Sequence, residues 1–306
     1  MRPDLAVLYE HPTWFQPLFA ALDRVGVQYE AIRLSDHCFD PSSSEIPAPV
    51  VLSRVAMSGF VREAEHGIYY AQALLAHWEA QGARVLNGAR ALAIDCSKAR
   101  QFSLIAGLGL ATPATRIVHR AQDLPAATQG MTWPLLVKPN VGGSGAEIRR
   151  YADLAELERS VADGTAPRSV DQVLLVQDYV PARDGTILRI ETLGGRFLYA
   201  IEVETGGDIF DLCPADACLA QPGRTAVEMK AVTPDPALVE AAERIADAAG
   251  LDVGGIEVMI DDRDGTPSFY DINALSNFVA NPLDVLGWDP HDRLVAFIAA
   301  AIEESR

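Results

Sequence analysis

Hydrophobic and polar positions along the first 90 residues switch between strand-like and helix-like spacing. Short apolar runs predict strands at residues 5–9, 29–34 and 50–52. Apolar residues at helical spacing predict helices at residues 14–25 and 67–82, each closed by a glycine. A strand–helix–strand–helix order is typical of a small open parallel sheet, and Asn87-Gly88 closes this unit.

The remainder of the chain also mixes the two periodicities, in a less regular order. Its middle part predicts helix over 89–108, an exposed strand at 115–118, a strand at 134–139, a helix at 152–161 and an apolar strand at 173–176. Its last part predicts a hairpin over 186–205 that turns at Gly194-Gly195, a helix at 236–249, a second hairpin over 255–273 and a closing helix at 291–303. The chain is therefore expected to be a mixed α/β protein.

Composition narrows the class of protein. A length of 306 residues allows two or three compact units, and 49% of the residues are apolar. The net charge of −17 argues against an extended nucleic-acid surface and against docking on anionic lipid. The first apolar run, residues 5–9, is too short for a signal peptide, and no stretch approaches the roughly 20 apolar residues of a membrane span. We expect a cytoplasmic protein.

The cysteines and histidines suggest no metal site. Cys38, Cys96, Cys213 and Cys218 are scattered, without zinc spacing and without a following histidine pair. They are expected to be thiols in a reducing cytosol. The histidines His66, His77 and His119 are assigned no role.

The second hairpin carries the clearest chemistry. Side chains alternate along a strand, so Asp271 and Asn273 share a face, and folding the hairpin about Asp264 brings Glu257 opposite Asp271. Two carboxylates and an amide oxygen form a hard-oxygen set that suits magnesium beside phosphates. The opposite, core face is expected to hold Ile256, Val258, Ile260, Tyr270 and Ile272. Taken alone, the segment also fits a hairpin with polar residues on its wet side.

Two further segments suit a nucleotide. The predicted strand at residues 134–139 contains Lys138. It is followed by a loop with Gly142, Gly143, Ser144 and Gly145. Glycines let backbone N–H groups approach anionic oxygens, and lysine adds a point charge. The order of residues differs from the P-loop and from the dinucleotide fingerprint, and an ordinary glycine turn with a surface lysine is the alternative. Residues 173–180 offer backbone groups to an adenine edge and Asp184 offers a carboxylate to ribose, unless this segment is only an interdomain linker.

In this order the segments resemble the ATP-grasp superfamily of carboxylate–amine ligases, which includes D-alanine–D-alanine ligase, glutathione synthetase and the ribosomal-protein glutamate ligases. The resemblance covers residues 87–282. Residues 87–98 look like the family's opening segment, whose lysine meets the ATP phosphates, and residues 110–115 are similar to its proline- and threonine-containing passage. Each motif is weak alone, but five in register make a specific signal.

The resemblance implies an ATP-grasp fold, α/β (α+β) in class. Its units would be an N-terminal open parallel α/β domain at 1–88, a central lid domain at 89–176 and a C-terminal domain at 177–306 that carries the metal site. ATP would bind between the last two. A homodimer is a family expectation with no motif here to support it.

The resemblance also implies a role for each site residue. Lys98 and Lys138 would hold the phosphates, with the glycine loop closing over them as a lid. The adenosine would contact Gln177, Asp178, Tyr179, Val180, Asp184 and Met259. Two Mg²⁺ ions, with Mn²⁺ as a substitute, would be held by Glu257, Asp271 and Asn273. Arg189 would steady the phosphoryl group and the tetrahedral intermediate, unless it is a surface arginine on its hairpin.

The implied reaction joins a small carboxylate to an amine, in amino acids or peptides. The carboxylate would attack ATP to form an acylphosphate, and the amine would then displace phosphate to leave an amide and ADP. Candidate substrate residues are Arg54 and Ser58, which follow a strand end, and Ser276 and Asn277, which follow the metal motif. Alternatives are phosphoryl transfer alone, intramolecular ring closure, or a nucleotide-binding module without catalysis.

Three departures from the family pattern concern the first lysine, the metal ligands and the acceptor site. Ser97-Lys98 stands where Asp-Lys is usual, and Asp271 stands where glutamate is usual, which keeps the charge but shortens the reach by a methylene. Residues 274–282 replace the Pro-Gly continuation of the peptide-type ligases. The acceptor amine therefore cannot be carried over from the family.

Overall fold

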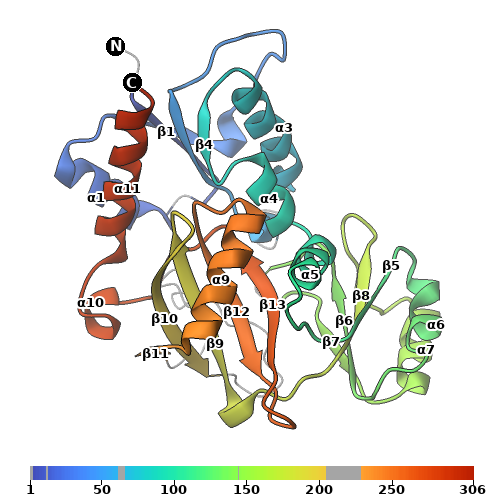
Figure 1. The fold of residues 1–306 in the computed structure, drawn as a ribbon. Coiled ribbons are helices and arrows are strands. Elements are labelled where there is room, and N and C mark those ends of the chain that lie inside the picture. The colour runs from blue at the N-terminus through green and yellow to red at the C-terminus, as the bar shows by residue number, and fades with distance from the viewer. Residues whose placement is uncertain (1–2, 12, 61–65, 144, 205–228) are drawn as a thin grey trace.

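A computed structural model describes residues 3–11, 13–60, 66–143, 145–204 and 229–306. Ser144, Cys213 and Cys218 lie outside these residues, as does the end of the first predicted hairpin at Thr205. Three sheets organise the described chain, and they draw their strands from residues 5–86, 115–178 and 186–273. Figure 1 shows them as three separate layers of strands, each with its own helices. The domain bounds at 88/89 and 176/177 stay a prediction.

The first sheet is parallel, with strand order β2-β1-β3-β4. Its strands are β1 (Leu5–Tyr9), β2 (Tyr29–Arg33), β3 (Val50–Arg54) and β4 (Arg84–Leu86). Alternation sends Leu5 and Val7 toward α1 (Gln16–Val25) on one face, and Ala6 and Leu8 toward α3 (Gly67–Ala80) on the other. The small open parallel sheet expected from the periodicity is thus confirmed, with one more strand than was predicted.

The second sheet is antiparallel, with strand order β5-β8-β6-β7. Its strands are β5 (Thr115–Val118), β6 (Leu135–Pro139), β7 (Arg149–Tyr151) and β8 (Leu174–Asp178), and its helices are α6 (Leu124–Ala127) and α7 (Leu154–Ala162). These helices and the inner faces of the strands enclose a small core of their own. Beside it, the helix expected over 89–108 is split into α4 (Ala89–Asp95) and α5 (Lys98–Gly107). The split follows from Ser97, whose side chain caps α5 by accepting a hydrogen bond from the Arg100 backbone N–H.

The third sheet has strand order β11-β10-β9-β12-β13 and is also antiparallel. Its strands are β9 (Thr186–Leu193), β10 (Arg196–Glu204), β11 (Met229–Val232), β12 (Val253–Ile260) and β13 (Pro267–Asn273). Helix α9 (Pro236–Ala249) covers one face, where Ile190, Ile256 and Ile272 are buried against it (Figure 1). The opposite face carries charged and polar side chains, including Arg189, Glu257 and Asp271.

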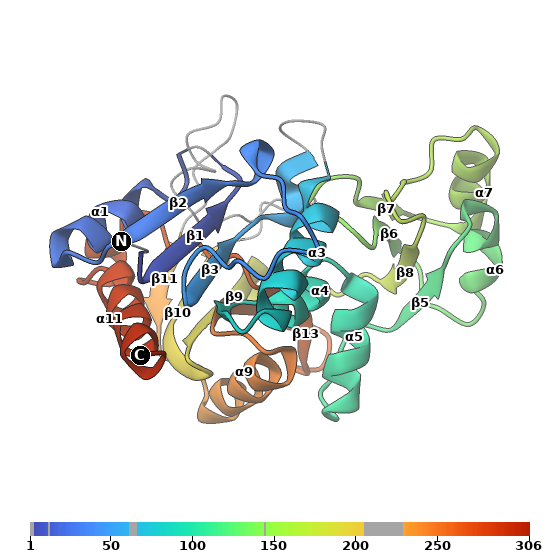
Figure 2. The ribbon, with the colours of Figure 1, turned by 90° about the horizontal axis from the view of Figure 1, so that it is seen from above.

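The last helix carries the chain back to the first sheet. After α10 (Pro282–Val285), helix α11 (Pro290–Glu304) packs beside α1 (Figure 1), and Arg306 pairs with Asp4 just before β1 at 3.0 Å. Leu294 and Ile298 of α11 share one core with Leu5 of β1 and Ile201 of β10. Seen from above, the second sheet stands apart at the far side from α11 (Figure 2). The first and third sheets are therefore joined by a common core.

Single turns of 3₁₀ helix complete the described elements, at η1 (Leu34–Asp36), η2 (Met57–Gly59), η3 (Ala121–Asp123) and η4 (Arg183–Gly185). None of the helices in the described part of the chain combines the length and apolar character needed to cross a bilayer.

Candidate active site

Two rows of polar residues cross the open face of the third sheet. In the first row, Arg189 of β9 is paired with Glu257 of β12, and Glu257 is paired with Asp271 of β13. We call Arg189, Glu257 and Asp271 the charged row. The second row, two residues along, consists of Glu191, Gly255 and Asn273. The register expected for the hairpin, with Glu257 opposite Asp271, is confirmed.

One side chain of the hairpin was assigned to the wrong face. The register changes after Glu257, because Val258 pairs with Phe269 and leaves Tyr270 as the extra residue of a β-bulge. A bulge interrupts strict alternation, so Phe269 joins the core under α9, while Tyr270 packs with Met259 on the charged side. Burial, followed by the nearby Glu257 carboxylate, raises the pKa of Tyr270 well above its usual value.

Arg189 is held between two carboxylates in the buried part of this face. Its Nε donates to Oε1 of Glu191 at 2.7 Å, and its Nη1 donates to Oε1 of Glu257 at 3.0 Å. Burial opposes the charge of the guanidinium, but these two carboxylates outweigh it and raise the pKa of Arg189. Arg189 is thus a fixed, permanently charged group rather than a surface arginine.

Gly255 makes room for this arrangement. A Cβ atom at this position would lie 2.8 Å from Nε and Nη2 of Arg189 and from Oε1 of Glu191. The absence of a side chain between Glu191 and Asn273 therefore lets the guanidinium of Arg189 lie against the sheet.

Lys98 and Lys138 approach the charged row from the side of the second sheet. Lys98, in the first turn of α5, donates from Nζ to Oδ1 of Asp271 at 2.7 Å. Burial opposes its charge, but Asp271 outweighs that effect and raises the pKa of Lys98. Lys138, on β6, is buried without a hydrogen-bonding carboxylate among the described residues, and burial together with Lys98 lowers the pKa of Lys138 to about 7. Lys98 and Lys138 are thus near enough to affect each other's charge, and two neighbouring ammonium groups suit a polyanion.

Asn140 couples the two lysines. Its Oδ1 accepts hydrogen bonds from the Ala99 backbone N–H at 2.8 Å and from the Ser97 hydroxyl at 3.1 Å. Its Nδ2 donates to Asp171 at 2.6 Å. One buried amide therefore ties the start of α5 to the strand that carries Lys138.

The glycine loop lies against the first sheet's unit. A Cβ on Gly143 would be 2.6 Å from Cβ of Ser58, and one on Gly142 would be 3.2 Å from Cγ of Pro139. Gly145 has a positive φ of 67°, which favours glycine. The structure thus brings the predicted loop and the predicted substrate residue Ser58 into contact.

The predicted adenosine segment joins the second sheet to the third. Gln177 donates from Nε2 to Thr115 at 2.9 Å, and the backbone N–H of Tyr179 donates to the Pro134 carbonyl at 3.3 Å. The next residues reach the turn between β12 and β13 through a bridge between Ala182 and Asp261. Further predicted residues in this region are Asp178 on β8, Val180 after it, Asp184 on η4 with a positive φ of 55°, and Met259 on β12.

Arg54 contacts the segment that follows β13, in the interior of the protein. Arg54 ends β3, is only 1% exposed, and donates from Nη2 to the Ser276 carbonyl. Its Cζ lies 5.6 Å from the ring centroid of Phe15. The Ser276 hydroxyl is within 3.4 Å of Nη2 of Arg189, so Ser276 contacts both arginines. Two of the four predicted substrate residues, Arg54 and Ser276, are therefore brought together beside Arg189, and Asn277 directly follows Ser276.

Several buried polar residues of the site were not singled out from the sequence. Glu191 holds Arg189, and Asp95 accepts a hydrogen bond from the Ala274 backbone N–H at 3.0 Å. Burial raises the pKa of Asp95 to about 7. The amides of Asn87 and Gln101 each make several backbone hydrogen bonds that hold the ends of β12 and β13. Glu191 could have been found from its two-residue spacing after Arg189, which puts both on one face.

The carboxylates of the charged row can accommodate a hard cation. Arg189 and Asn273 contact only Oε1 of Glu257, and Lys98 contacts only Oδ1 of Asp271, so these contacts leave one oxygen of each carboxylate. Burial, followed by Asp271, raises the pKa of Glu257, as expected for adjacent carboxylates. Within the described residues no three His, Cys, Asp or Glu side chains cluster as a metal site, so the donor set here is two carboxylates and the Asn273 amide.

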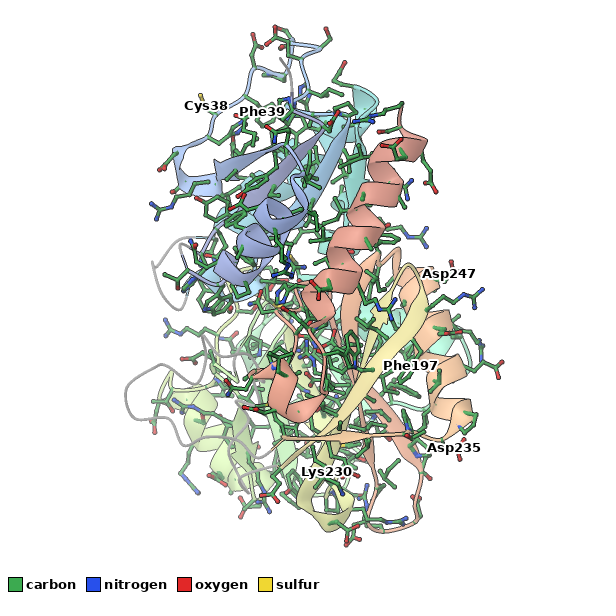
Figure 3. All side chains as sticks on the ribbon, turned by 90° about the vertical axis from the view of Figure 1, so that its left-hand side faces the viewer. Cys38, Phe39, Phe197, Lys230, Asp235 and Asp247 are labelled. Atoms are coloured by element: carbon green, nitrogen blue, oxygen red, sulfur yellow. The ribbon has the colours of Figure 1, made fainter. Side chains whose placement is uncertain are left out.

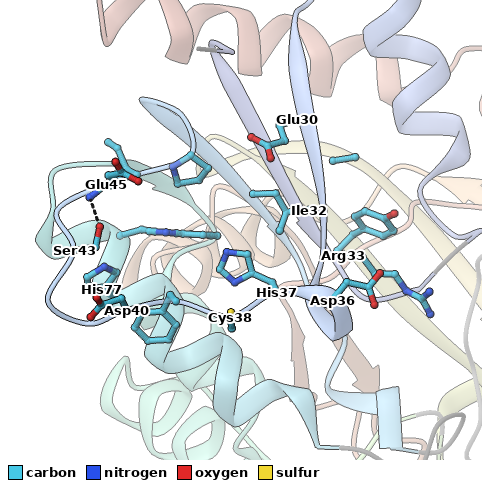
Figure 4. Close-up of a pocket in the computed structure, with 16 residues that line it drawn as sticks. Glu30, Ile32, Arg33, Asp36, His37, Cys38, Asp40, Ser43, Glu45 and His77 are labelled. Atoms are coloured by element: carbon cyan, nitrogen blue, oxygen red, sulfur yellow. Dashed lines mark hydrogen bonds between the residues drawn. The ribbon is translucent and has the colours of Figure 1, made fainter. Parts of the chain in front are cut away.

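A separate pocket of about 880 Å³ opens in the first sheet's unit, between β2, the loop over residues 36–47 and α3 (Figure 4). Its wall includes Glu30, His37, Cys38 and His77, but none of the predicted site residues. Cys38 lies at the end of the molecule opposite Lys230 (Figure 3). This pocket is distinct from the charged row.

No family model matches the chain. It is 28% identical over 233 residues to a probable alpha-L-glutamate ligase of Klebsiella pneumoniae, covering 75% of this chain and 72% of the relative. It is 30% identical over 125 residues to the D-alanine–D-alanine ligase of Hydrogenovibrio crunogenus, covering 41% of this chain and only 38% of that enzyme.

Among solved structures, the ATP-grasp ligase PsnB, complexed with a precursor variant, Mg and ADP, matches with a TM-score of 0.70 at 15% identity. The match covers 99% of both chains. The three sheets of this chain are thus those of the ATP-grasp fold, as expected. In fold and in sequence the chain is therefore similar to ATP-grasp ligases, among them the glutamate ligases and the D-alanine–D-alanine ligases.

Proposed function

We propose that this protein is an ATP- and Mg²⁺-dependent ligase that joins a small carboxylate to an amine. The observation that carries the proposal is the convergence of Lys98 and Lys138 on the charged row, where the lysines, Arg189 and Glu257 are buried and Asp271 is partly buried. Phosphoryl transfer needs charge neutralisation and alignment more than covalent help, and this arrangement supplies both. The curated relatives are themselves named as ligases.

The proposed reaction has two steps. An oxygen of the substrate carboxylate bonds to the γ-phosphorus as its bond to ADP breaks, which gives an acylphosphate. The amine nitrogen then bonds to the acyl carbon, phosphate leaves, and the nitrogen loses a proton. Lys98 and Lys138 would hold the phosphates, and Arg189 would stabilise the charge that develops on the acyl oxygen. Glu257, Asp271 and Asn273 would hold Mg²⁺, which supplies further charge neutralisation when bound.

The surrounding residues would bind and enclose the reactants. The loop with Gly142, Gly143 and Gly145 packs against Ser58, so its closure would exclude the water that hydrolyses an acylphosphate. Adenosine would lie between the segment at residues 177–184 and Met259. The substrates would lie near Arg54, Ser276 and Asn277, where the first sheet's unit meets the third sheet.

The test is an ADP-release screen of the purified protein with Mg-ATP across pairs of carboxylates and amines, followed by mass measurement of the product. We expect ADP and phosphate with at least one pair, and a product equal to the two substrates less one water. Lys138→Ala should abolish turnover, and the double variant Asp271→Ala, Asn273→Ala should lose the Mg²⁺-dependent activity. ADP and phosphate without any amide would instead favour phosphoryl transfer alone. A product formed from one substrate less one water would favour ring closure.

A further inference from the structure

The β-bulge in β13 places Tyr270 beside the carboxylates of the charged row. Glu257 pairs with Asp271 and Val258 pairs with Phe269, so the side chain of Tyr270 is the extra one in the strand. As a result two successive residues, Tyr270 and Asp271, lie on the charged side of the sheet, while Phe269 lies in the core under α9. Bulges are common next to active sites, where they redirect a side chain. The bulge therefore brings a phenol to the predicted cation ligands.

The hydroxyl of Tyr270 is buried and has no hydrogen-bond partner among the described residues. Such a hydroxyl destabilises the folded protein, and native structures contain few of them. The ring packs against the same core as Met259, and this packing needs no hydroxyl. The hydroxyl is therefore best explained by a partner that it gains when a ligand binds.

The carboxylate of Glu257 is the acceptor beside this hydroxyl. Burial, followed by that carboxylate, raises the pKa of Tyr270, so the two groups are close, although they fall outside hydrogen-bonding geometry. Oε1 of Glu257 already accepts hydrogen bonds from Nη1 of Arg189 at 3.0 Å and from Nδ2 of Asn273 at 3.3 Å. These contacts leave Oε2 for Tyr270. Carboxylates that bind a metal are in turn held by hydrogen bonds from neighbouring groups.

We propose that Tyr270 positions Glu257 for cation binding, by donating a hydrogen bond from its hydroxyl to Oε2 of Glu257 when the charged row holds Mg²⁺. The inference rests on the proposed function, because it adds a positioning residue to the metal site proposed there. A carboxylate oxygen has two lone pairs, so Oε2 can accept from Tyr270 and bind a cation together. Tyr270 itself would not touch the metal.

The charges already present in the row explain why a neutral donor is useful there. Arg189 holds one oxygen of Glu257 at 3.0 Å, and Lys98 holds one oxygen of Asp271 at 2.7 Å. A metal ion must therefore compete with two cationic side chains for these carboxylates. The phenol of Tyr270 is uncharged, because its pKa lies well above the usual value. It can fix the orientation of Glu257 without offsetting the negative charge that attracts the metal.

The test measures metal-supported nucleotide binding without turnover. Calorimetry compares ADP binding in EDTA with ADP binding in millimolar Mn²⁺, for the unmodified protein and for Tyr270→Phe, which loses only the hydroxyl. In Mn²⁺ we expect Tyr270→Phe to bind ADP about 10- to 100-fold more weakly, the range typical of groups that orient metal ligands. In EDTA the two proteins should bind ADP equally. No loss in Mn²⁺, or an equal loss in EDTA, which would mean direct contact with the nucleotide, would overturn the inference.

Thermal stability separates this positioning role from a structural one. Tyr151 supplies the matched control, since its hydroxyl is buried in the core of the second sheet and bonds the Ser160 hydroxyl at 2.8 Å. Tyr151→Phe should lower the Tm of the metal-free protein and leave ADP binding in Mn²⁺ unchanged. Tyr270→Phe should keep or raise the Tm, because it removes a buried hydroxyl that has no partner. If its Tm falls as in Tyr151→Phe, the hydroxyl already has a partner without metal and the inference is wrong.

A double-mutant cycle tests whether Tyr270 acts through Glu257. Glu257→Asp keeps the charge but withdraws the carboxylate by a methylene, so adding Tyr270→Phe to it should weaken ADP binding in Mn²⁺ by less than about twofold. Losses that multiply would mean that the two residues act independently, against the inference. If these expectations hold but no substrate pair yields an amide, only the proposed function fails. If amides form while Tyr270→Phe binds ADP normally in Mn²⁺, only this inference fails.

Discussion

The charged row and the Arg54 cluster lie on neighbouring parts of one buried face, but they satisfy their charges differently. The Arg54 cluster consists of Arg54, Glu191 and Ser276. In the charged row, Lys98 meets Asp271 at 2.7 Å and Arg189 meets Glu257 at 3.0 Å. In the Arg54 cluster, by contrast, Nε and Nη1 of Arg54 and Oε2 of Glu191 have no partner in the part of the chain that the structure describes. The charges of the row hold one another, whereas Arg54 is positioned by packing and a single carbonyl, and Glu191, among the described residues, by Arg189 alone.

This difference separates two kinds of recognition. Phosphates and a cation can bind to charged side chains that are paired with one another in the free protein, because a multivalent ligand can replace those pairings with its own. Selecting one small substrate needs donors and acceptors that are left unpaired unless the correct groups arrive. Arg189 belongs to both regions, since it contacts Glu257 in the row and Glu191 and Ser276 in the cluster.

The largest expected effect follows from removing Arg189. Arg189→Met leaves Glu191 and Glu257 as buried carboxylates without their cation, and breaking a buried pair in this way costs about 3–5 kcal/mol of unfolding free energy. The proposed ligase activity should fall by about 10³-fold or more. Urea unfolding and ADP release measure the two effects. Arg54→Met, which breaks no ion pair, should change the unfolding free energy by only about 1 kcal/mol.

A second variant shows whether unpaired carboxylates cause the loss. Adding Glu191→Gln to Arg189→Met removes one uncompensated charge and should recover part of the unfolding free energy without recovering activity. If Arg189→Met were as stable as the unmodified protein, the carboxylates would not depend on Arg189, and the contrast between the two regions would be wrong.

A smaller effect is expected from filling the gap at Gly255. In Gly255→Ala the new methyl group would lie 2.8 Å from both Arg189 and Glu191, so the guanidinium must shift. We expect a loss of about 1–3 kcal/mol in unfolding free energy, and of about 10- to 100-fold in turnover. Gly107→Ala is the matched control, because nothing lies within 4 Å of its Cβ position and its stability should change by less than about 1 kcal/mol. Full activity in Gly255→Ala would show that Arg189 need not be fixed.

Much of the fold follows from sequence periodicity because most elements bury a regular face. The two hairpins of the third sheet, the parallel first sheet and helix α9 were all predicted. Tyr270 was predicted on the wrong face for a local reason. One extra residue in a β-bulge ends strict alternation, and no residue type in the sequence indicates the bulge. Ser97 did carry a readable signal, because a serine before a helical stretch is a common cap.

Less of the candidate site could be predicted. The register of Glu257 with Asp271 follows from the length of the turn, whereas Arg189 was assigned only through the family resemblance. The roles of Asn140, Asn87 and Asp95 could not be predicted, because each acts through backbone groups more than 30 residues away in the chain. Contacts of that kind depend on how the three sheets pack, which no local pattern specifies.

The titration of Lys138 gives a different kind of effect, on protons rather than on rates. Without nucleotide, burial and the nearby Lys98 lower the pKa of Lys138 to about 7, well below its value of 10.5 in an unfolded chain. The unfolded chain therefore binds more protons than the folded one between about pH 7 and 10.5, so the unfolding free energy should rise with pH across that range. Lys138→Met should remove this slope, which urea unfolding at several pH values can measure.

Nucleotide binding should reverse the effect on Lys138. Phosphate oxygens near Nζ favour the charged form, so binding of ATP raises the pKa of Lys138 and takes up a proton. At pH 8 the uptake should be about 0.9 proton, and at pH 6 only about 0.1, because the lysine is then already charged. Calorimetry in buffers of different ionisation enthalpy measures this number. Protonation of ATP itself contributes equally to Lys138→Met and cancels in the difference, so an identical uptake in the two proteins would place Lys138 away from the phosphates.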